Sequence, residues 1–443
     1  MVWPRWFGEM SDSGEAAPEN SEENLAELAP LLTTPRTPFR EVITTLDGLR
    51  EVLSQLTLGS GDIALDAERA SGFKYSQRAY LIQIYRRGGG LHLLDPIAIT
   101  QNSTVETPLA LLNPVIQSAE VVIHASSQDL PCLREVGIEP VHLFDTELAG
   151  RIAGFPRVGL GALTESLLGI RLAKEHSAVD WSQRPLNEDW LIYAALDVDV
   201  LLDLKDEIVN ILRSKEKLEW ALQESAAALH APPAAPRKDP WRRTSGIHQV
   251  KKPEQLAIIR ELWRARDLLA RERDIASGRL LNDRVLVNVA LKPPATVQNL
   301  RSVPALRKDA DYWWQALEAA RANPHVNKAG ASDGPPTQLR IWRERAPIGY
   351  ARLTHARHAL SELAAKLELP AENLLAPDLV RRFCWEDPPS GGRSEATVVE
   401  FLRGLGARPW QISFTAALLR EIESALTPLV IESPAEEEVS ELS

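Results

Sequence analysis

Four carboxylates and one phenol have the residue types and spacing to form a single chemical site. Asp66 and Glu68 are separated by one residue at the end of an apolar run. Residues i and i+2 of a strand project from the same face, so a strand here would point both carboxylates the same way. Asp129 follows a second apolar run, and Tyr193 and Asp197 have the i, i+4 spacing that puts two side chains on one helix face.

Such a site would bind divalent cations. Same-face carboxylates at the end of an apolar strand are unfavourable unless a cation lies between them. Ligands that are all oxygen suit Mg²⁺ or Mn²⁺ rather than zinc. Two such ions side by side can activate a water and stabilise in-line displacement at phosphorus. Each motif alone is common by chance, so the prediction rests on the order of the whole set.

The elements that must position these residues are visible in the hydrophobic pattern. The pattern predicts a mixed sheet with helices packed on it. The run at 121–124 is almost wholly apolar, which is typical of a strand buried on both faces. The predicted strands are 62–66, 80–85, 91–94 and 121–124, with a hairpin turn at 86–90, and the predicted helices include 45–56, a segment around 107–117 and most of 143–229.

Length and composition are those of an ordinary multidomain globular protein. The chain has 443 residues, of which 44% are hydrophobic and 25% charged, so a collagenous, coiled-coil or fully disordered protein is excluded. It has neither an apolar run of about 18 residues nor a secretory leader, so we expect no membrane partner. The only cysteines, Cys132 and Cys384, are far apart, which favours a reducing cytoplasm and no disulfide-linked partner. A monomer is the default expectation.

The net charge of −11 argues by itself against a nucleic-acid partner, but its distribution reverses that inference. Residues 41–235 hold 27 acidic and 16 basic residues, whereas residues 236–430 hold 22 acidic and 31 basic residues. The two ends, 1–40 and 431–443, are both acidic. The chain therefore joins a module that can gather metal ions to one that can gather phosphates.

The motifs resemble, in collinear order over about residues 40–215, those of the ribonuclease D family in the tyrosine-bearing subclass of the DEDD exonucleases. The matching stretches are Ile63-Ala-Leu-Asp-Ala-Glu68, Ala79-Tyr-Leu-Ile-Gln-Ile84, Val122-Ile-His-Ala-Ser-Ser-Gln-Asp-Leu130, Leu143-Phe-Asp-Thr-Glu147, Asp180-Trp-Ser-Gln-Arg-Pro-Leu186 and Tyr193-Ala-Ala-Leu-Asp197. The resemblance implies a ribonuclease H-like α/β exonuclease fold that needs two divalent cations, Mg²⁺ or Mn²⁺.

The resemblance also implies a role for each residue of the set. Asp66, Glu68 and Asp197 would hold the ion that activates water. Asp66 would also reach the second ion, which Asp129 would bind directly or through water. Tyr193 would position the attacking water or help to deprotonate it. Asp145 and Glu147 form a further acidic pair, for which we expect a structural role.

The basic half of the chain resembles HRDC domains, which are small helical modules that bind nucleic acid or protein. Residues 236–285 hold 13 basic and 7 acidic residues, and a helix is predicted over 254–273. The segments 262–274 and 280–286 carry the resemblance, which extends over about 248–325. The block 338–430 resembles a second, diverged HRDC domain.

The excess of positive charge suggests contacts to RNA phosphates rather than to bases. The alternative is that these arginines only solvate helices or pair with Glu261, Asp267 and Glu272. Arg69, which follows the DxE motif, is either a further phosphate contact or a surface residue. The residues predicted to contact nucleic acid are Arg69, Arg242, Arg243, Lys251, Lys252 and Arg264.

These patterns predict an α/β exonuclease domain followed by all-α HRDC-type domains. The expected division is a disordered acidic leader (1–38), the exonuclease domain (39–230), a linker (231–240), an HRDC domain (241–327), a second linker (328–337), a second HRDC-like domain (338–430) and a disordered acidic tail (431–443).

The function hypothesis is 3′→5′ hydrolysis of RNA to 5′-mononucleotides. The resemblance suggests as partner an RNA with a free 3′ end, with precursors of tRNA and other small structured RNAs as substrates. A DNA 3′→5′ exonuclease remains an alternative, because nothing in the five site residues distinguishes ribose from deoxyribose. A catalytically idle RNA-binding adaptor is a further alternative, which the intact set of five residues disfavours.

Overall fold

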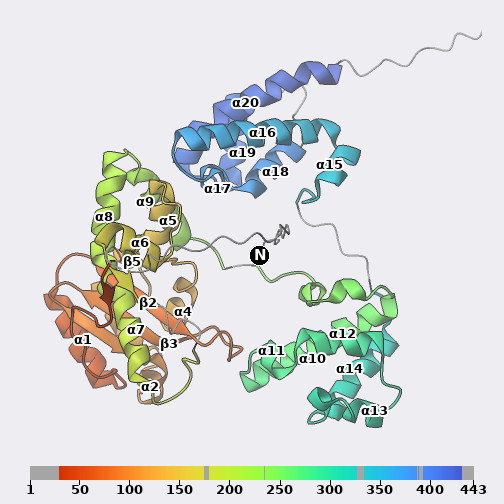
Figure 1. Cartoon of the computed structure of the whole chain (residues 1–443), viewed down its shortest axis with the longest axis horizontal. Coiled ribbons are helices and arrows are strands. Elements are labelled where there is room, and N and C mark those ends of the chain that lie inside the picture. Colours follow the sequence, from red (N-terminus) through yellow and green to blue (C-terminus); the bar gives the residue numbers. More distant parts are fainter. Residues whose placement is uncertain are drawn as a thin grey trace, which may run out of the picture.

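The computed structural model describes residues 29–173, 179–233, 235–326, 334–386, 388 and 393–431. The predictions for the leader up to residue 28 and for the tail from residue 432 therefore lie outside the described residues. Within the described part, an α/β body is followed by two helical blocks (Figure 1).

The α/β body is built on a five-stranded mixed sheet with the order β4-β3-β2-β5-β6. Its strands are β2 Ile63–Arg69, β3 Ala79–Arg86, β4 Gly90–Leu94, β5 Val121–Ile123 and β6 Leu143–Asp145. Strands β2, β3 and β4 form an antiparallel meander, whereas β5 runs parallel to both β2 and β6. The mixed sheet is thus confirmed, and all three residues of β5 are buried, as its apolar run predicts.

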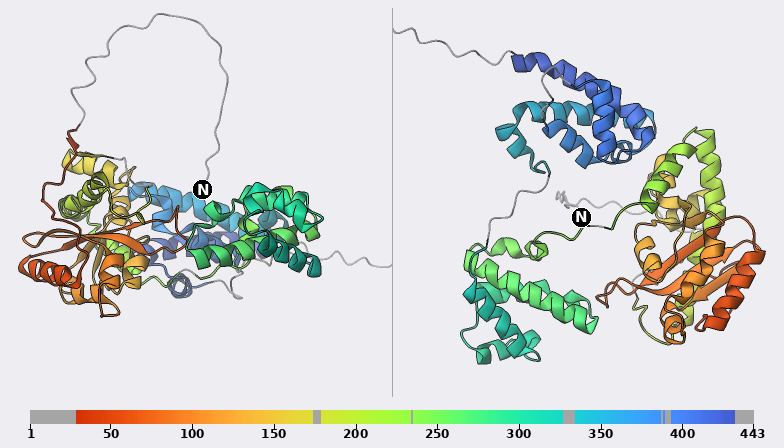
Figure 2. Two further views of the ribbon diagram at one scale, coloured as in Figure 1. Left: turned by 90° about the horizontal axis from the view of Figure 1, so that it is seen from below. Right: turned by 180° about the vertical axis from the view of Figure 1, so that it is seen from behind.

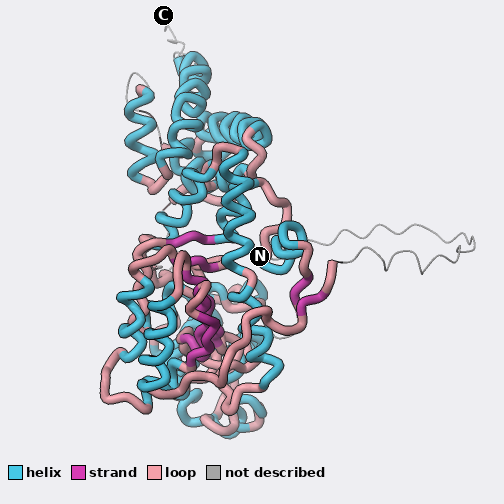
Figure 3. Tube along the Cα trace, turned by 90° about the vertical axis from the view of Figure 1, so that its left-hand side faces the viewer, coloured by secondary structure: helices cyan, strands magenta, loops and turns pink. Residues whose placement is uncertain are grey.

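Alternation along β2 divides the body into two apolar cores. Ile63, Leu65 and Ala67 belong to the core on the side of α1. Ala64 belongs to the opposite core, beneath α7. Figure 3 shows the strands gathered in one body and the upper region built of helices and loops. The helices of this body are α1 Leu46–Leu58, α2 Pro96–Gln101, α3 Asn113–Ile116, α4 Leu130–Glu135, α5 Thr146–Ala153, α6 Leu160–Leu168, α7 Glu188–Asp199, α8 Leu201–Ser214 and α9 Leu218–Leu229.

The helix expected around residues 107–117 is two short elements instead. Residues Pro108–Leu112 form a 3-10 turn, η1, which continues into α3. Each element has a proline in its first turn, where the missing backbone N–H is least costly.

The end of the predicted leader is ordered, which corrects the expectation of disorder through residue 38. Strand β1, Leu31–Leu32, pairs in parallel with β7, Arg171–Leu172. The Arg36 guanidinium then donates to Asp199 at 3.0 Å and to Asp203 at 2.8 Å. Residues 29–38 therefore form a strap across the α/β body, because an arginine and two backbone pairings compensate the loss of chain entropy.

The first helical block is all-helical, as its sequence predicts. Its elements are η2 Pro240–Arg243, η3 Ile247–Gln249, α10 Pro253–Arg273, α11 Ser277–Leu280, α12 Asp283–Leu291, α13 Val297–Arg301, η4 Pro304–Leu306 and α14 Ala310–Ala322. Trp241 and Trp313 are buried in its own apolar core.

The second helical block shares its core with the α/β body. Its helices are α15 Leu339–Arg345, α16 Pro347–Lys366, α17 Ala371–Leu374, α18 Pro377–Trp385, α19 Glu395–Gly404 and α20 Pro409–Ile431. One apolar cluster joins residues of this block to α5, α8 and α9. At the seam, Trp410 stacks on Trp220 with 5.0 Å between ring centroids, and Arg408 pairs with Glu224 at 2.7 Å. The second block is therefore packed against the α/β body through apolar, aromatic and ionic contacts.

None of the helices in the described part of the chain has the length and apolar character needed to cross a membrane.

We predict that Gly154→Ala destabilises this seam more than Gly169→Ala does. Both glycines end helices at positive φ, +92° and +63°, so either alanine costs about 1–2 kcal/mol of backbone strain. At Gly154 the added Cβ would lie only 2.5 Å from the carbonyl oxygen of Glu368 in the second block, whereas the space at Gly169 is open. Thermal unfolding followed by calorimetry should show the larger loss of Tm for Gly154→Ala, and equal losses would contradict the tight seam.

Candidate active site

Strand β2 presents Asp66 and Glu68 from the face opposite to Leu65 and Ala67. In the antiparallel pairing with β3, Asp66 lies across from Gln83 and Glu68 lies across from Leu81. Both acidic residues are partly buried beneath α7. The period-two prediction for the DxE pair is therefore correct.

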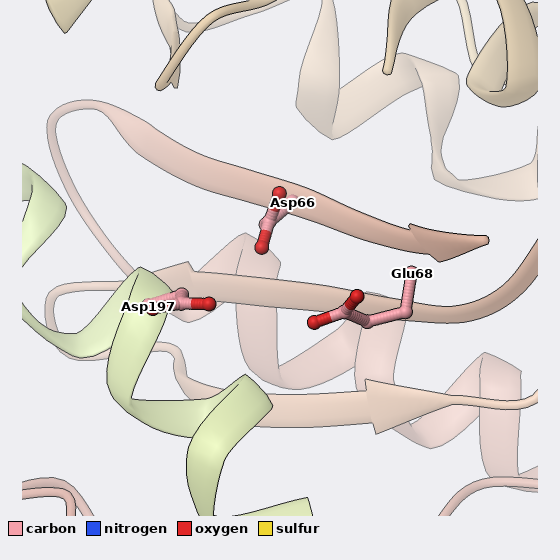
Figure 4. A group of neighbouring side chains, drawn as sticks. All are labelled: Asp66, Glu68 and Asp197. Carbon is pink, nitrogen blue, oxygen red and sulfur yellow. The ribbon is translucent and has the colours of Figure 1, made fainter. Parts of the chain in front are cut away.

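Helix α7 supplies the phenol and a further carboxylate. Asn187 caps its N-terminus by accepting a hydrogen bond from the N–H of Asp189, and the helix then runs unbroken through Tyr193 and Asp197. Carboxylate oxygens of Asp66, Glu68 and Asp197 all lie within 4.8 Å of one another. Figure 4 shows the three side chains converging from β2 and α7.

Asp129 reaches the same cluster from the turn between β5 and α4. It is buried, and its side chain is hydrogen-bonded to that of Asp66. Asp145 braces this turn by accepting hydrogen bonds from the N–H of Ser126 at 2.8 Å and the Ser126 hydroxyl at 2.7 Å. It also accepts from the N–H of Glu147 at the start of α5. The structural role predicted for Asp145 is confirmed, while Asp129 joins the site.

Burial raises the pKa values of all four carboxylates in the cluster. Burial raises the pKa of Asp66 and Asp197, and it raises the pKa of Glu68 well above its ordinary value, with the other carboxylates adding to the effect. Burial and the charge of Asp66 likewise raise the pKa of Asp129. A cluster of closely spaced carboxylate oxygens fits Mg²⁺ or Mn²⁺, which would take the place of the protons.

A cavity of about 430 Å³ opens beside the carboxylates. This volume lies within the range of small-molecule sites. Asp66, Tyr193 and Asp197 line one part of it, and His124 and Leu172 line another. A 2.8 Å hydrogen bond between Nδ1 of His124 and the Thr146 hydroxyl holds this side chain in place. His124 therefore both contacts the start of α5 and lines the cavity.

The residues predicted to contact nucleic acid divide into two groups. Arg69 lies at the carboxylate cluster, where it donates to the side chain of Gln128 at 2.9 Å. The other five belong to the first helical block. Among these, Arg242 stacks on Trp241 and pairs with Asp239, and Arg264 pairs with Glu261 at 3.0 Å. Arg243, Lys251 and Lys252 are exposed.

Sequence reasoning missed two features that surround the site. In the strap at residues 29–38, Arg36 pairs with Asp199, two residues beyond Asp197. No local sequence pattern predicts that pairing. The loop between β2 and β3 contacts the first helical block through Asp267 and Asp274. Both contacts join residues more than 150 positions apart, so no spacing rule finds them.

Comparisons with known proteins agree with this geometry. Residues 40–213 match the family model described as 3'-5' exonuclease, and residues 255–310 match the HRDC domain. Residues 334–422 match a third model, described as 3' to 5' exonuclease C-terminal domain. The second helical block therefore matches a different family model from the HRDC model that matches the first block.

Curated relatives decide the family. The ribonuclease D of Gluconacetobacter diazotrophicus is 30% identical over 302 residues, which are 65% of this chain and 73% of that protein. The chain belongs to the ribonuclease D family. It accordingly combines a 3'-5' exonuclease domain with an HRDC domain. The ribonuclease D of Bartonella henselae is also 30% identical, but that match covers 43% of this chain and about half, 47%, of its own length.

Two solved structures extend the likeness over the helical blocks. A protein from Bifidobacterium adolescentis is 37% identical with a TM-score of 0.81, and the match covers 89% of this chain and 100% of that one. Escherichia coli RNase D is 25% identical with a TM-score of 0.60, covering 87% and 98%. The arrangement of the α/β body and helical blocks is therefore shared with known structures.

We predict that Mn²⁺ raises the Tm of the protein and that Asp66→Asn removes this effect. A ligand at a hundredfold excess over its Kd stabilises the folded state by about 2.7 kcal/mol. Because the folded-state pKa values are raised, ionised carboxylates destabilise the metal-free protein at neutral pH. Asp66→Asn should therefore also raise the Tm in EDTA.

The control is Asp311→Asn, which removes a solvent-exposed carboxylate paired with Arg301. Its Tm should respond to Mn²⁺ as the unmodified protein does. A full Mn²⁺ response in Asp66→Asn would contradict the assignment of this cluster as the metal site.

Proposed function

We propose that the protein shortens RNA from its 3′ end and releases 5′-mononucleotides, using two divalent cations at the Asp66 cluster. The observation that carries the proposal is the convergence of Asp66, Glu68 and Asp197 within 4.8 Å of one another in a member of the ribonuclease D family. Such close carboxylates are compatible with full ionisation only when cations lie between them.

The carboxylates divide into two overlapping sets in this proposal. Asp66, Glu68 and Asp197 hold one ion, and Asp66 and Asp129 hold the other. When bound, the ions supply an activated water and neutralise charge that develops at phosphorus. The closeness of Asp129 to Asp66, whose charge raises the pKa of Asp129, supports the sharing of Asp66 between both sets.

Tyr193 orients the attacking water through its hydroxyl. Burial, together with the charges of Asp197 and Glu68, raises the pKa of Tyr193 above its ordinary value. The ordinary pKa of a phenol already keeps Tyr193 protonated at neutral pH, so its hydroxyl acts as a hydrogen-bond donor. This favours the positioning role over that of a general base, since a tyrosinate would be needed to take a proton.

The terminal nucleotide occupies the cavity lined by His124, Leu172 and Tyr193, with a phosphate near Arg69. Arg69 is suited to this because its guanidinium already lies at the carboxylate cluster and its neutral partner, Gln128, can be exchanged for a phosphate oxygen.

The body of the RNA lies against exposed basic residues of the HRDC domain. Lys251 and Lys252 stand just before α10, and Arg243 is exposed nearby. Arg260 and Arg266 take no part, because both are buried and donate to backbone carbonyls. Binding through the backbone alone makes recognition depend on shape and charge rather than on base sequence.

The substrates are precursors of tRNA and other small structured RNAs. Escherichia coli RNase D, which this chain resembles over most of its length, is described as an exoribonuclease involved in structured RNA processing. The buried, unpaired thiols of Cys132 and Cys384 are compatible with work in the reducing cytoplasm, and we propose that the protein acts there as a monomer.

We predict that Asp197→Asn abolishes trimming of a 3′-extended tRNA in Mg²⁺, because the ion held by Asp66, Glu68 and Asp197 loses one of its three carboxylate ligands. Tyr193→Phe should slow trimming by roughly tenfold to a hundredfold, as expected for loss of a water-positioning hydroxyl, while Mn²⁺ binding stays unchanged. Single-turnover rates and calorimetric titration of Mn²⁺ measure the two effects.

Substrate controls accompany this measurement. A single-stranded DNA of matched sequence and the same RNA in EDTA should remain intact. Equal trimming of DNA would refute the preference for RNA, and retained trimming by Asp197→Asn would refute the two-cation proposal.

We predict that Lys251→Glu lowers RNA affinity and flattens its dependence on salt. Each phosphate contact to a single strand contributes about 0.7 to the slope of log affinity against log salt, so losing one contact lowers the slope by about that amount. Point variants are preferable to truncation, because removing the second helical block would expose the core it shares with α5, α8 and α9.

The matched control is Lys366→Glu, an equal charge reversal at an exposed lysine of the second helical block. Its salt slope should match that of the unmodified protein. Identical slopes for all three proteins would exclude a phosphate contact at Lys251.

A further inference from the structure

The loop that follows the catalytic strand is held by the HRDC domain. Residues 70–78 connect β2, which carries Glu68, to β3. Figure 1 shows this hairpin projecting from the α/β body toward α10 and α11, and the right-hand view of Figure 2 shows the same approach from behind. The domain predicted to hold RNA therefore contacts the segment that directly adjoins the metal site.

Three main-chain groups of the loop are satisfied by the HRDC domain. The N–H of Ser76 donates to the Asp274 carboxylate at 2.9 Å. The carbonyl of Gly72 accepts from Arg279 at 2.7 Å, and the carbonyl of Phe73 accepts from the N–H of Ala276 at 2.9 Å. Contacts to main-chain groups fix the path of the loop itself, whatever its side chains do.

Side chains of the loop add a second set of contacts. The Tyr75 hydroxyl donates to Asp267 at 3.0 Å and accepts from Arg271 at 3.2 Å. The guanidinium of Arg279 lies 3.8 Å from the centre of the Phe73 ring, a cation–π contact. The loop and the HRDC domain therefore meet at several residues rather than at a single contact.

Asp274 is the centre of the junction. It ends α10 in the left-handed conformation, with φ +47° and ψ +50°, a geometry that a non-glycine residue adopts at some cost. In that geometry its carboxylate reaches Ser76, Arg78 at 3.5 Å and the Tyr80 hydroxyl at 3.4 Å. One side chain of the HRDC domain thereby holds both the loop and the beginning of β3.

The path of the loop bears directly on Glu68. The pairing of β2 with β3 shifts register between Glu68 and Arg69: Glu68 pairs with Leu81 and Arg69 with Ala79, so Tyr80, whose hydroxyl contacts Asp274, is the extra residue at this irregular point of the ladder. Glu68 is thus positioned by the sheet on one side and by the docked loop on the other. Catalytic geometry is sensitive to displacements of about 1 Å, which a change in loop path can supply.

We propose that the HRDC domain sets the position of Glu68 through the 70–78 loop, with Asp274 as the positioning residue. Docking of the HRDC domain on the loop and assembly of the carboxylate cluster are then coupled, so each stabilises the other. This coupling rests on the proposed function, whereas the positioning itself concerns metal affinity and can be measured without RNA.

The test compares Asp274→Gly with the unmodified full-length protein. Glycine tolerates the left-handed conformation, so the variant removes the carboxylate contacts without new backbone strain. We expect Mn²⁺ affinity, measured by calorimetric titration in the absence of RNA, to fall about tenfold, in the range of ordinary coupling between sites. The kcat for a 3′-extended tRNA should fall, while KM changes little.

Two further variants keep the result interpretable. Tyr75→Phe removes only the hydroxyl contacts from the other side of the junction and should shift Mn²⁺ affinity in the same direction by less. Asp309→Ala removes an HRDC carboxylate whose partner, Arg273, lies within the same domain, and it should leave both Mn²⁺ affinity and kcat unchanged.

The outcomes separate the two proposals. Unchanged Mn²⁺ affinity in both Asp274→Gly and Tyr75→Phe would overturn the positioning role, even if the unmodified protein trims RNA. Loss of Mn²⁺ affinity in these variants, with an unmodified protein that trims no RNA, would support the positioning role and refute the proposed function. Equal losses in Asp309→Ala would show a general effect of HRDC destabilisation and would also overturn the proposal.

Discussion

Repulsion among four crowded carboxylates is the constraint on which the structure depends. Asp66, Glu68 and Asp197 lie within 4.8 Å of one another, Asp129 is hydrogen-bonded to Asp66, and burial raises all four pKa values. Repulsion between ionised carboxylates would by itself drive these side chains apart. They stay together because the backbone that carries them is fixed by contacts elsewhere, and cations are the natural means of relieving the repulsion.

The contacts that fix this backbone are made by residues other than the four carboxylates. Apolar cores on both faces of the sheet hold β2 and α7. Asp145 holds the turn that presents Asp129, and Arg36 holds Asp199 at the end of α7. Ser126 lies three residues before Asp129, and Asp199 lies two residues after Asp197, so each of these structural hydrogen bonds is close to a candidate metal ligand. The residues that make these contacts, Asp145 and Arg36, are not among the candidate site residues.

Negative and positive side chains are concentrated in different domains of the chain. The α/β body concentrates carboxylates, and the HRDC domain carries the exposed lysines that favour phosphate. Many arginines of that domain are structural, since Arg260, Arg266 and Arg273 donate to carbonyls or carboxylates within it. The positive surface is therefore smaller than the composition suggests. Among the described residues, the 70–78 loop joins β2 of the α/β body to α10 and α11 of the HRDC domain.

The sequence by itself determined the features that short-range periodicity encodes. Alternation placed Asp66 and Glu68 on one face of a strand, and helical spacing placed Tyr193 with Asp197. The apolar run at 121–124 predicted a strand buried on both faces, which is β5. Only the tertiary structure decided that residues 29–38 are ordered, which arginines are exposed, and that Asp274 meets Ser76 across the domain boundary. The reason is physical: periodicity is set by backbone geometry within a few residues, whereas those contacts depend on how distant segments pack.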